Sequence, residues 1–183
     1  MRCPSSSLIP HPSSLIPHPA MPTPIPPGPG QESVWDYPRP PALEPVGQTV
    51  RVEFAGRTVA ESDGALRILE TSHPPTIYIP PGDVDLSLLV ATPKTSGCEW
   101  KGRAVYYDLD IDGRRAPEAA WAYPDPRARY LALKDHLAFY PGRVDACWLG
   151  GERATPQPGR FYAGWITSQV VGPFKGEPGT WGW

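Results

Sequence analysis

The sequence predicts a mainly β protein whose antiparallel sheets are built of hairpins, with one main α-helix. Three observations predict this fold class. Residues 50–59, 105–113 and 144–153 each place alternating apolar and polar residues next to a short turn. Residues 65–69 and 76–79 add two further segments of β type. Sequence patterns typical of a helix, by contrast, are scarce.

Composition separates the N-terminal residues from the rest of the chain. The chain has 27 prolines, concentrated near its start, and residues 6–12 are repeated without change as residues 13–19. Because such a short repeat cannot bury a core, we expect residues 1–31 to be a disordered proline-rich leader. We expect residues 32–183 to form a single β-rich domain. We hypothesise that translation starts at Met21; the alternative is a genuine leader that includes the repeat.

The turn residues support each hairpin. Val50–Phe54 alternates apolar and charged residues, and Gly56 lies in the turn before a return strand through Val59. The second and third hairpins have Asp112-Gly113 and Gly150-Gly151 at the corresponding places. These residue types tolerate the positive φ angles that tight hairpin turns require.

The main helix is predicted for residues 127–136. Asp125 is a suitable N-cap and Pro126 a suitable first residue, since proline needs no N–H partner there. Its buried face is expected at Tyr130, Leu133 and Leu137. A short helical turn is also predicted over residues 84–89.

Charge and cysteine content exclude several classes of protein. A net charge of −2, without any Lys/Arg-rich run, argues against nucleic-acid binding. No run of eighteen apolar residues exists, so we expect no membrane association. The three cysteines include no C-x-x-C pair, which argues against a disulfide framework and a zinc site and favours a reducing, cytoplasmic setting. We predict no cofactor and no metal.

Short clusters of ionisable and aromatic residues predict a binding site. Residues 70–80 place an acid, an imidazole and a phenol on a proline-containing stretch, and residues 98–102 and 121–125 add a lysine and further rings. A few polar groups among aromatic side chains are the usual composition of ligand pockets. We therefore predict a pocket formed by Glu70, His73, Tyr78, Trp100, Lys101, Trp121 and Tyr123.

Two interpretations remain open for the charged members of this set. Glu70 and His73 are candidate catalytic residues, an acid that orients an imidazole acting as general base, with Tyr78 donating to a bound oxygen. Alternatively, Glu70 binds backbone amides and His73 caps a turn. Lys101 is suited to a carboxylate or phosphate, but it could also be a surface lysine paired with Glu99.

Asp108 and Asp110 form the arrangement that magnesium-dependent nucleotidyltransferases use, because residues i and i+2 share one face of a strand. We favour a structural explanation, in which both carboxylates face water on the outer side of the hairpin. Cys98 has no base nearby in the sequence and is not predicted to be a nucleophile.

A set of motifs runs through the domain: Ser33-Val-Trp, Glu70-Thr-Ser-His-Pro-Pro, Tyr78-Ile-Pro, Cys98 with Lys101-Gly, Tyr106-Tyr, Ala119-Ala-Trp-Ala-Tyr-Pro, His136-Leu-Ala-Phe-Tyr, Val144-Asp-Ala and Val171-Gly-Pro-Phe-Lys-Gly. With these motifs the chain resembles the bacterial family catalogued as domain of unknown function 427. The resemblance implies an antiparallel β-tent-like fold that holds a small ligand between sheets. Some members have been labelled nucleotidyltransferase-like. Zinc-bearing relatives of this fold use paired cysteines, which this chain lacks.

Three functions are compatible with these observations. The leading one is a domain that binds a small polar or anionic molecule in an aromatic-walled pocket. The second is a transferase or hydrolase that uses Glu70 and His73 for acid/base chemistry. The third is a homodimeric interaction module whose exposed aromatic residues pair across a two-fold axis.

Overall fold

The computed structural model describes residues 21–183. The repeat at residues 6–19 and the start-site hypothesis therefore lie outside the described residues. Residues 21–183 form short strands, three long strands and three 3₁₀ segments. In chain order these are β1 (Glu32–Ser33), β2 (Ala42–Pro45), β3 (Val50–Phe54), β4 (Arg57–Ser62), β5 (Leu66–Leu69), β6 (Thr76–Tyr78), η1 (Pro81–Asp83), η2 (Leu86–Leu88), β7 (Leu89–Cys98), β8 (Gly102–Ile111), β9 (Arg114–Pro126), η3 (Ala128–Leu133), β10 (Ala138–Phe139), β11 (Ala146–Leu149), β12 (Glu152–Arg153), β13 (Thr155–Pro156), β14 (Trp165–Ile166) and β15 (Val170–Val171).

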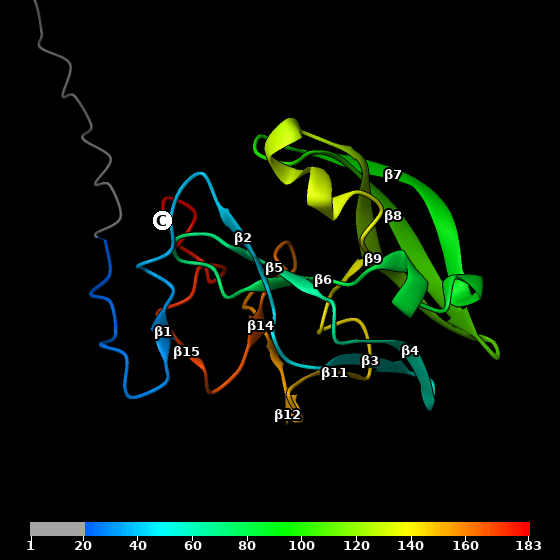
Figure 1. Ribbon diagram of the computed structural model, residues 1–183, viewed down its shortest axis with the longest axis horizontal. Coiled ribbons are helices and arrows are strands. Elements are labelled where there is room, and N and C mark those ends of the chain that lie inside the picture. Colours follow the sequence, from blue (N-terminus) through cyan, green and yellow to red (C-terminus); the bar gives the residue numbers. More distant parts are fainter. Residues whose placement is uncertain (1–20) are drawn as a thin grey trace, which may run out of the picture.

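The strands form two four-stranded sheets and three smaller ones. The first has the order β10-β9-β8-β7 and the second β12-β11-β3-β4, while β2-β5-β6 forms a three-stranded sheet. Strand β1 pairs with β15 in parallel, and β13 pairs with β14. In Figure 1 the long, curved strands β7, β8 and β9 lie on one side of the domain and β3, β4 and β11 on the other. The prediction of a mainly β fold with antiparallel sheets is confirmed.

The main core lies between the two four-stranded sheets. Val50 and Val52 of β3 pack in one cluster with Leu109 and Ile111 of β8, and Phe139 of β10 joins them. All five side chains are buried. Alternation along each strand brings these residues to the inner face, so their burial is what holds the sheets together.

All three predicted hairpins form. Strands β3 and β4 pair through a turn at Ala55-Gly56, β8 and β9 through Asp112-Gly113, and β11 and β12 through Gly150-Gly151. Both residues of each turn have positive φ, between +50° and +86°. The predicted β segments at residues 65–69 and 76–79 correspond to β5 and β6.

The helical segments are shorter than predicted. The helix expected over residues 127–136 is a 3₁₀ segment, η3, interrupted at Tyr130, whose φ of −116° is not helical. The reason is that Asp125 and Pro126 belong to β9, where they pair with Arg103 and Gly102. They therefore do not cap a helix. Among residues 21–183, no helix is long and apolar enough to cross a membrane.

Candidate functional site

A cavity of about 320 Å³ lies between strands β5 and β6, the β7–β8–β9 sheet and the segment 157–163. Its volume is within the usual range of small-molecule sites. The structure brings all seven residues of the predicted pocket to the wall of this cavity: Glu70, His73, Tyr78, Trp100, Lys101, Trp121 and Tyr123. Their role in binding stays a prediction.

Aromatic rings form most of the inner wall. Tyr106 of β8 pairs directly with Trp121 of β9, and Tyr123 lies two residues further along the same face. The Trp121 ring centroid is 4.8 Å from that of Tyr140 and 6.0 Å from that of Tyr78. All five rings are less than 10% exposed. The wall is therefore preformed and closely packed.

The phenol groups of the wall are proton donors. Burial raises the pKa of Tyr78 and of Tyr123 well above the usual 10.0. Both hydroxyls therefore stay protonated at neutral pH, and each offers an O–H to an acceptor.

His73 is placed by a sharp turn. Ser72 has a φ of +69°, and the His73 N–H donates to the main-chain oxygen of Glu70 over 3.0 Å. The ring Nδ1 lies 2.9 Å from the main-chain oxygen of Thr71, and the ring packs edge-on against Tyr162. Burial lowers the pKa of His73 below its usual 6.5. The imidazole is therefore neutral at pH 7.

Glu70 does not orient the imidazole by direct contact. Its carboxylate pairs with Arg39 at 3.4 Å, and Arg39 also donates to the Thr71 main-chain oxygen at 3.0 Å. The group that orients His73 is the Thr71 carbonyl. Glu70 acts on the imidazole only through its charge, which raises the pKa of His73 against the larger effect of burial.

Lys101 lies in the turn between β7 and β8 and is only 8% exposed. The alternative of a surface lysine paired with Glu99 is wrong, since no ion pair joins them in the described part of the chain. The Lys101 ammonium forms no ion pair with any carboxylate within residues 21–183. Trp100, beside it, is half-buried. Cys98 also lines the cavity as a free thiol.

Several residues of the cavity were not predicted from the sequence. Tyr106, Tyr140, Tyr162 and Lys175 all line it. Alternation along β8 could have identified Tyr106, but the other three come from segments whose positions depend on tertiary contacts. Lys175 is 9% exposed, donates to the main-chain oxygen of Trp183 over 2.8 Å, and has a pKa lowered by burial.

Asp108 does not face water as expected, because it is only 4% exposed. Between Tyr107 and Leu109, β9 contains extra residues, and this bulge leaves the N–H of Glu118 free of the strand ladder. One Asp108 oxygen accepts this N–H at 2.6 Å, and the other accepts the guanidinium of Arg115. Asp108 thus has a structural role. Among residues 21–183, no three His, Cys, Asp or Glu side chains are grouped as metal ligands would be.

Comparison with models of protein families gives a match. The family model described as Domain of unknown function (DUF427) matches residues 42–150, which is more than half of the chain. The matched region contains all seven predicted pocket residues but not Tyr162 or Lys175. No curated protein matches the chain. The motifs and this match together show that the chain belongs to the DUF427 family.

Proposed function

We propose that this domain binds a small polar or anionic organic molecule in the aromatic cavity, and that Lys101 is the main contact for its acidic or oxygen-rich group. The observation that carries this proposal is the environment of Lys101. The Lys101 side chain lines the cavity, is 8% exposed, and forms no ion pair within residues 21–183. Its stem is packed, but its ammonium nitrogen keeps contact with solvent. This charge is therefore free to pair with a bound anion.

The rest of the cavity supports the same class of ligand. The rings of Trp121, Tyr106 and Tyr140 offer flat apolar surface to a planar group, and the protonated phenols of Tyr78 and Tyr123 offer donors to ligand oxygens. Glu70, held by Arg39, would accept from a ligand hydroxyl or amine. The free thiols Cys98 and Cys147 also support a reducing, cytoplasmic setting for the protein.

The test is native mass spectrometry of untagged protein purified from its own host, compared with the denatured mass. We expect an organic adduct that is lost on denaturation. The adduct should be missing from Lys101→Met, which keeps the aliphatic stem without the charge, and retained by the exposed control Lys134→Met. Wild-type protein without any adduct would contradict the proposal. A ligand-free dimer would favour the interaction module instead.

The neutral state of His73 favours one second candidate, an enzyme that uses this imidazole as general base. Its Nδ1 is occupied by Thr71, which leaves Nε2 as the basic atom. If the adduct compound is turned over, His73→Gln should abolish turnover while the adduct still binds. Equal turnover by this variant would rule out catalysis by His73.

A further inference from the structure

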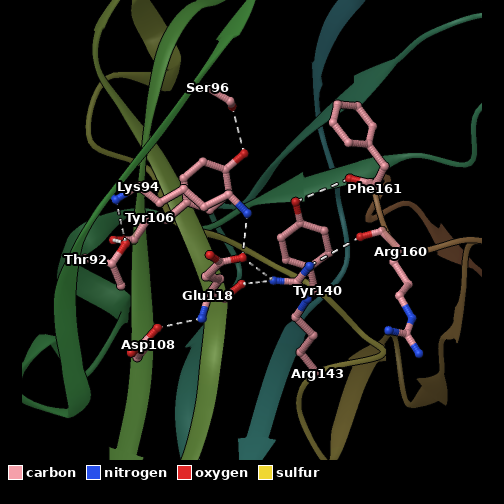
Figure 2. A network of polar contacts seen from close by, with 10 residues as sticks. All are labelled: Thr92, Lys94, Ser96, Tyr106, Asp108, Glu118, Tyr140, Arg143, Arg160 and Phe161. Atoms are coloured by element: carbon pink, nitrogen blue, oxygen red, sulfur yellow. Dashed lines mark hydrogen bonds and ion pairs between the residues drawn. The ribbon is translucent and has the colours of Figure 1, made fainter.

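Two aromatic residues of the cavity wall each contact a cation that does not itself line the cavity. The Lys94 ammonium lies 4.6 Å from the ring centroid of Tyr106, and the Arg143 guanidinium lies 4.1 Å from that of Tyr140. Tyr106 and Tyr140 line the cavity, whereas Lys94 and Arg143 do not. Figure 2 shows both cations packed against these rings.

One carboxylate holds both cations. An oxygen of Glu118 accepts from Lys94 at 2.5 Å and from Arg143 at 3.3 Å, and the main-chain oxygen of Glu118 accepts from Arg143 at 2.8 Å. We call Lys94, Glu118 and Arg143 the cation clamp. Both contacts lower the pKa of Glu118, that of Lys94 most strongly, so its carboxylate stays charged at neutral pH.

The backbone of the clamp is itself fixed. Glu118 lies in the bulge of β9 with a φ of +50°, and its N–H donates to Asp108 at 2.6 Å. The bulge re-aims the Glu118 side chain toward the two cations instead of continuing the strand alternation. The arrangement therefore requires an unfavourable backbone conformation at Glu118 and the buried carboxylate of Asp108.

The two rings are held at their hydroxyl ends as well. The Tyr106 hydroxyl lies 2.8 Å from the Ser96 hydroxyl, and the Tyr140 hydroxyl donates to the main-chain oxygen of Phe161 over 3.3 Å. Each ring thus has a cation on one face and a hydroxyl held by a hydrogen bond, and both residues line the cavity. Both walls are positioned before any ligand binds.

The clamp also has an electrostatic consequence. A group of phenol and indole rings without counter-charges is a good site for an organic cation, because the ring faces are electron-rich. Lys94 and Arg143 lie over ring faces and compensate that negative potential, and they outnumber the single carboxylate of Glu118. The clamp therefore disfavours cations in the cavity and favours anions.

We infer that the cation clamp of Lys94, Glu118 and Arg143 strengthens the preference for anions that Lys101 gives the cavity, so that the cavity takes planar aromatic anions and rejects aromatic cations of the same shape. Glu118 is the positioning residue, since it holds both cations against the rings. This inference rests on the proposed function of the cavity and specifies its ligand class.

The experiment uses three probes that share a benzene ring and differ in charge: benzoate, benzamide and phenyltrimethylammonium. In calorimetric titration of the full chain, benzoate should bind most tightly, benzamide less tightly and phenyltrimethylammonium least tightly. In Lys94→Met and Arg143→Met the preference for benzoate over benzamide should fall by about three- to tenfold. Lys94→Arg keeps the charge over the ring and should keep the wild-type preference for benzoate. The exposed control Lys134→Met should leave this preference unchanged.

Glu118→Gln separates positioning from net charge. This variant makes the clamp more positive, so net charge alone predicts a stronger preference for benzoate. If Glu118 acts by holding the cations in place, the preference falls instead, and that is the result we expect. A stronger preference would overturn the positioning role of Glu118.

The same titrations distinguish the selectivity of the clamp from binding by the cavity. Preferences that stay unchanged in Lys94→Met and Arg143→Met would overturn the selectivity role of the clamp while the cavity remains a binding site. Wild-type protein that binds none of the probes, or binds the cation best, would also overturn this inference. The native adduct and its loss in Lys101→Met then decide the proposed function independently.

Discussion

The Nδ1 atom of His73 lies 2.9 Å from the main-chain oxygen of Thr71, and this contact fixes the tautomer of the ring. Because a carbonyl oxygen only accepts, Nδ1 must carry the proton and Nε2 carries the lone pair. Burial is the largest influence on this ring and lowers the pKa of His73. The backbone turn at Ser72 thus determines the chemistry that the imidazole can offer.

Acid should therefore destabilise the fold in a range set by His73. Between the usual histidine pKa of 6.5 and the lower value in the folded state, the unfolded chain binds a proton at His73 and the folded chain does not. Stability should then fall as the pH decreases through this range. Urea unfolding midpoints measured from about pH 7 to about pH 5 would show the decline, before most carboxylates titrate.

Two variants test whether His73 causes this loss of stability at lower pH. His73→Gln keeps a donor for the Thr71 carbonyl and removes the titrating group, so its stability should change less over the same range. His136→Gln is the matched control, because His136 also has Nδ1 near a main-chain oxygen, that of Lys134 at 3.1 Å, but is only half-buried and lies outside the cavity. Parallel declines in wild type and His73→Gln would show that another group is responsible.

Asp108 and Asp110 should differ sharply in their contribution to stability. Asp108→Asn replaces a buried carboxylate that accepts from Glu118 N–H and Arg115, and should lower the free energy of unfolding by about 1–3 kcal/mol. Asp110→Asn changes an exposed side chain and should cost about 0.5 kcal/mol or less. Denaturant titration of both variants provides the comparison. Equal effects would mean that the bulge does not depend on Asp108.

The hairpins could be predicted because their signals are local. Turn pairs such as Asp112-Gly113 accept positive φ without help from distant residues, and the alternation next to them determines which face is buried. The same alternation wrongly predicted that Asp108 faces water, because the bulge opposite this residue depends on the register of β9. That register follows from the packing of two long strands and leaves no mark in a short window of sequence.

The site shows the same division between local and tertiary information. His73 and Lys101 could be predicted because each lies in a short stretch that combines polar, aromatic and turn-forming residues. Tyr140 and Lys175 could not, since only the folded chain brings their segments to the cavity. The helix prediction failed for a related reason. Pro126 lies opposite Gly102 in the pairing of β8 and β9, and so it does not start a helix.

Gly102 should be essential for the position of Lys101. Its φ of +105° is unfavourable for any other residue, and an added Cβ would lie 3.3 Å from the main-chain oxygen of Asp125. Gly102→Ala should therefore destabilise the fold by about 1–2 kcal/mol and weaken retention of the native adduct. Gly82→Ala is the control, since its φ is ordinary and the space around it is open. Thermal unfolding with native mass spectrometry measures both effects, and an unaltered adduct in Gly102→Ala would contradict this role.

Alkaline pH should test whether the aromatic wall excludes water. Burial raises the pKa of Tyr78, Tyr123 and Tyr140, so these phenols stay protonated in the folded chain while the unfolded chain ionises near pH 10. Above that pH the folded state binds more protons than the unfolded state, and stability should fall as the pH rises.

Phenolate absorbance should therefore appear in two steps, the second coinciding with loss of the folded circular dichroism signal. Tyr78→Phe and Tyr123→Phe should each reduce the second step. If all phenols ionised near pH 10 in the folded protein, Tyr78 and Tyr123 would be in contact with bulk water, and the proposed hydrogen bonds to a ligand would lose their dry surroundings.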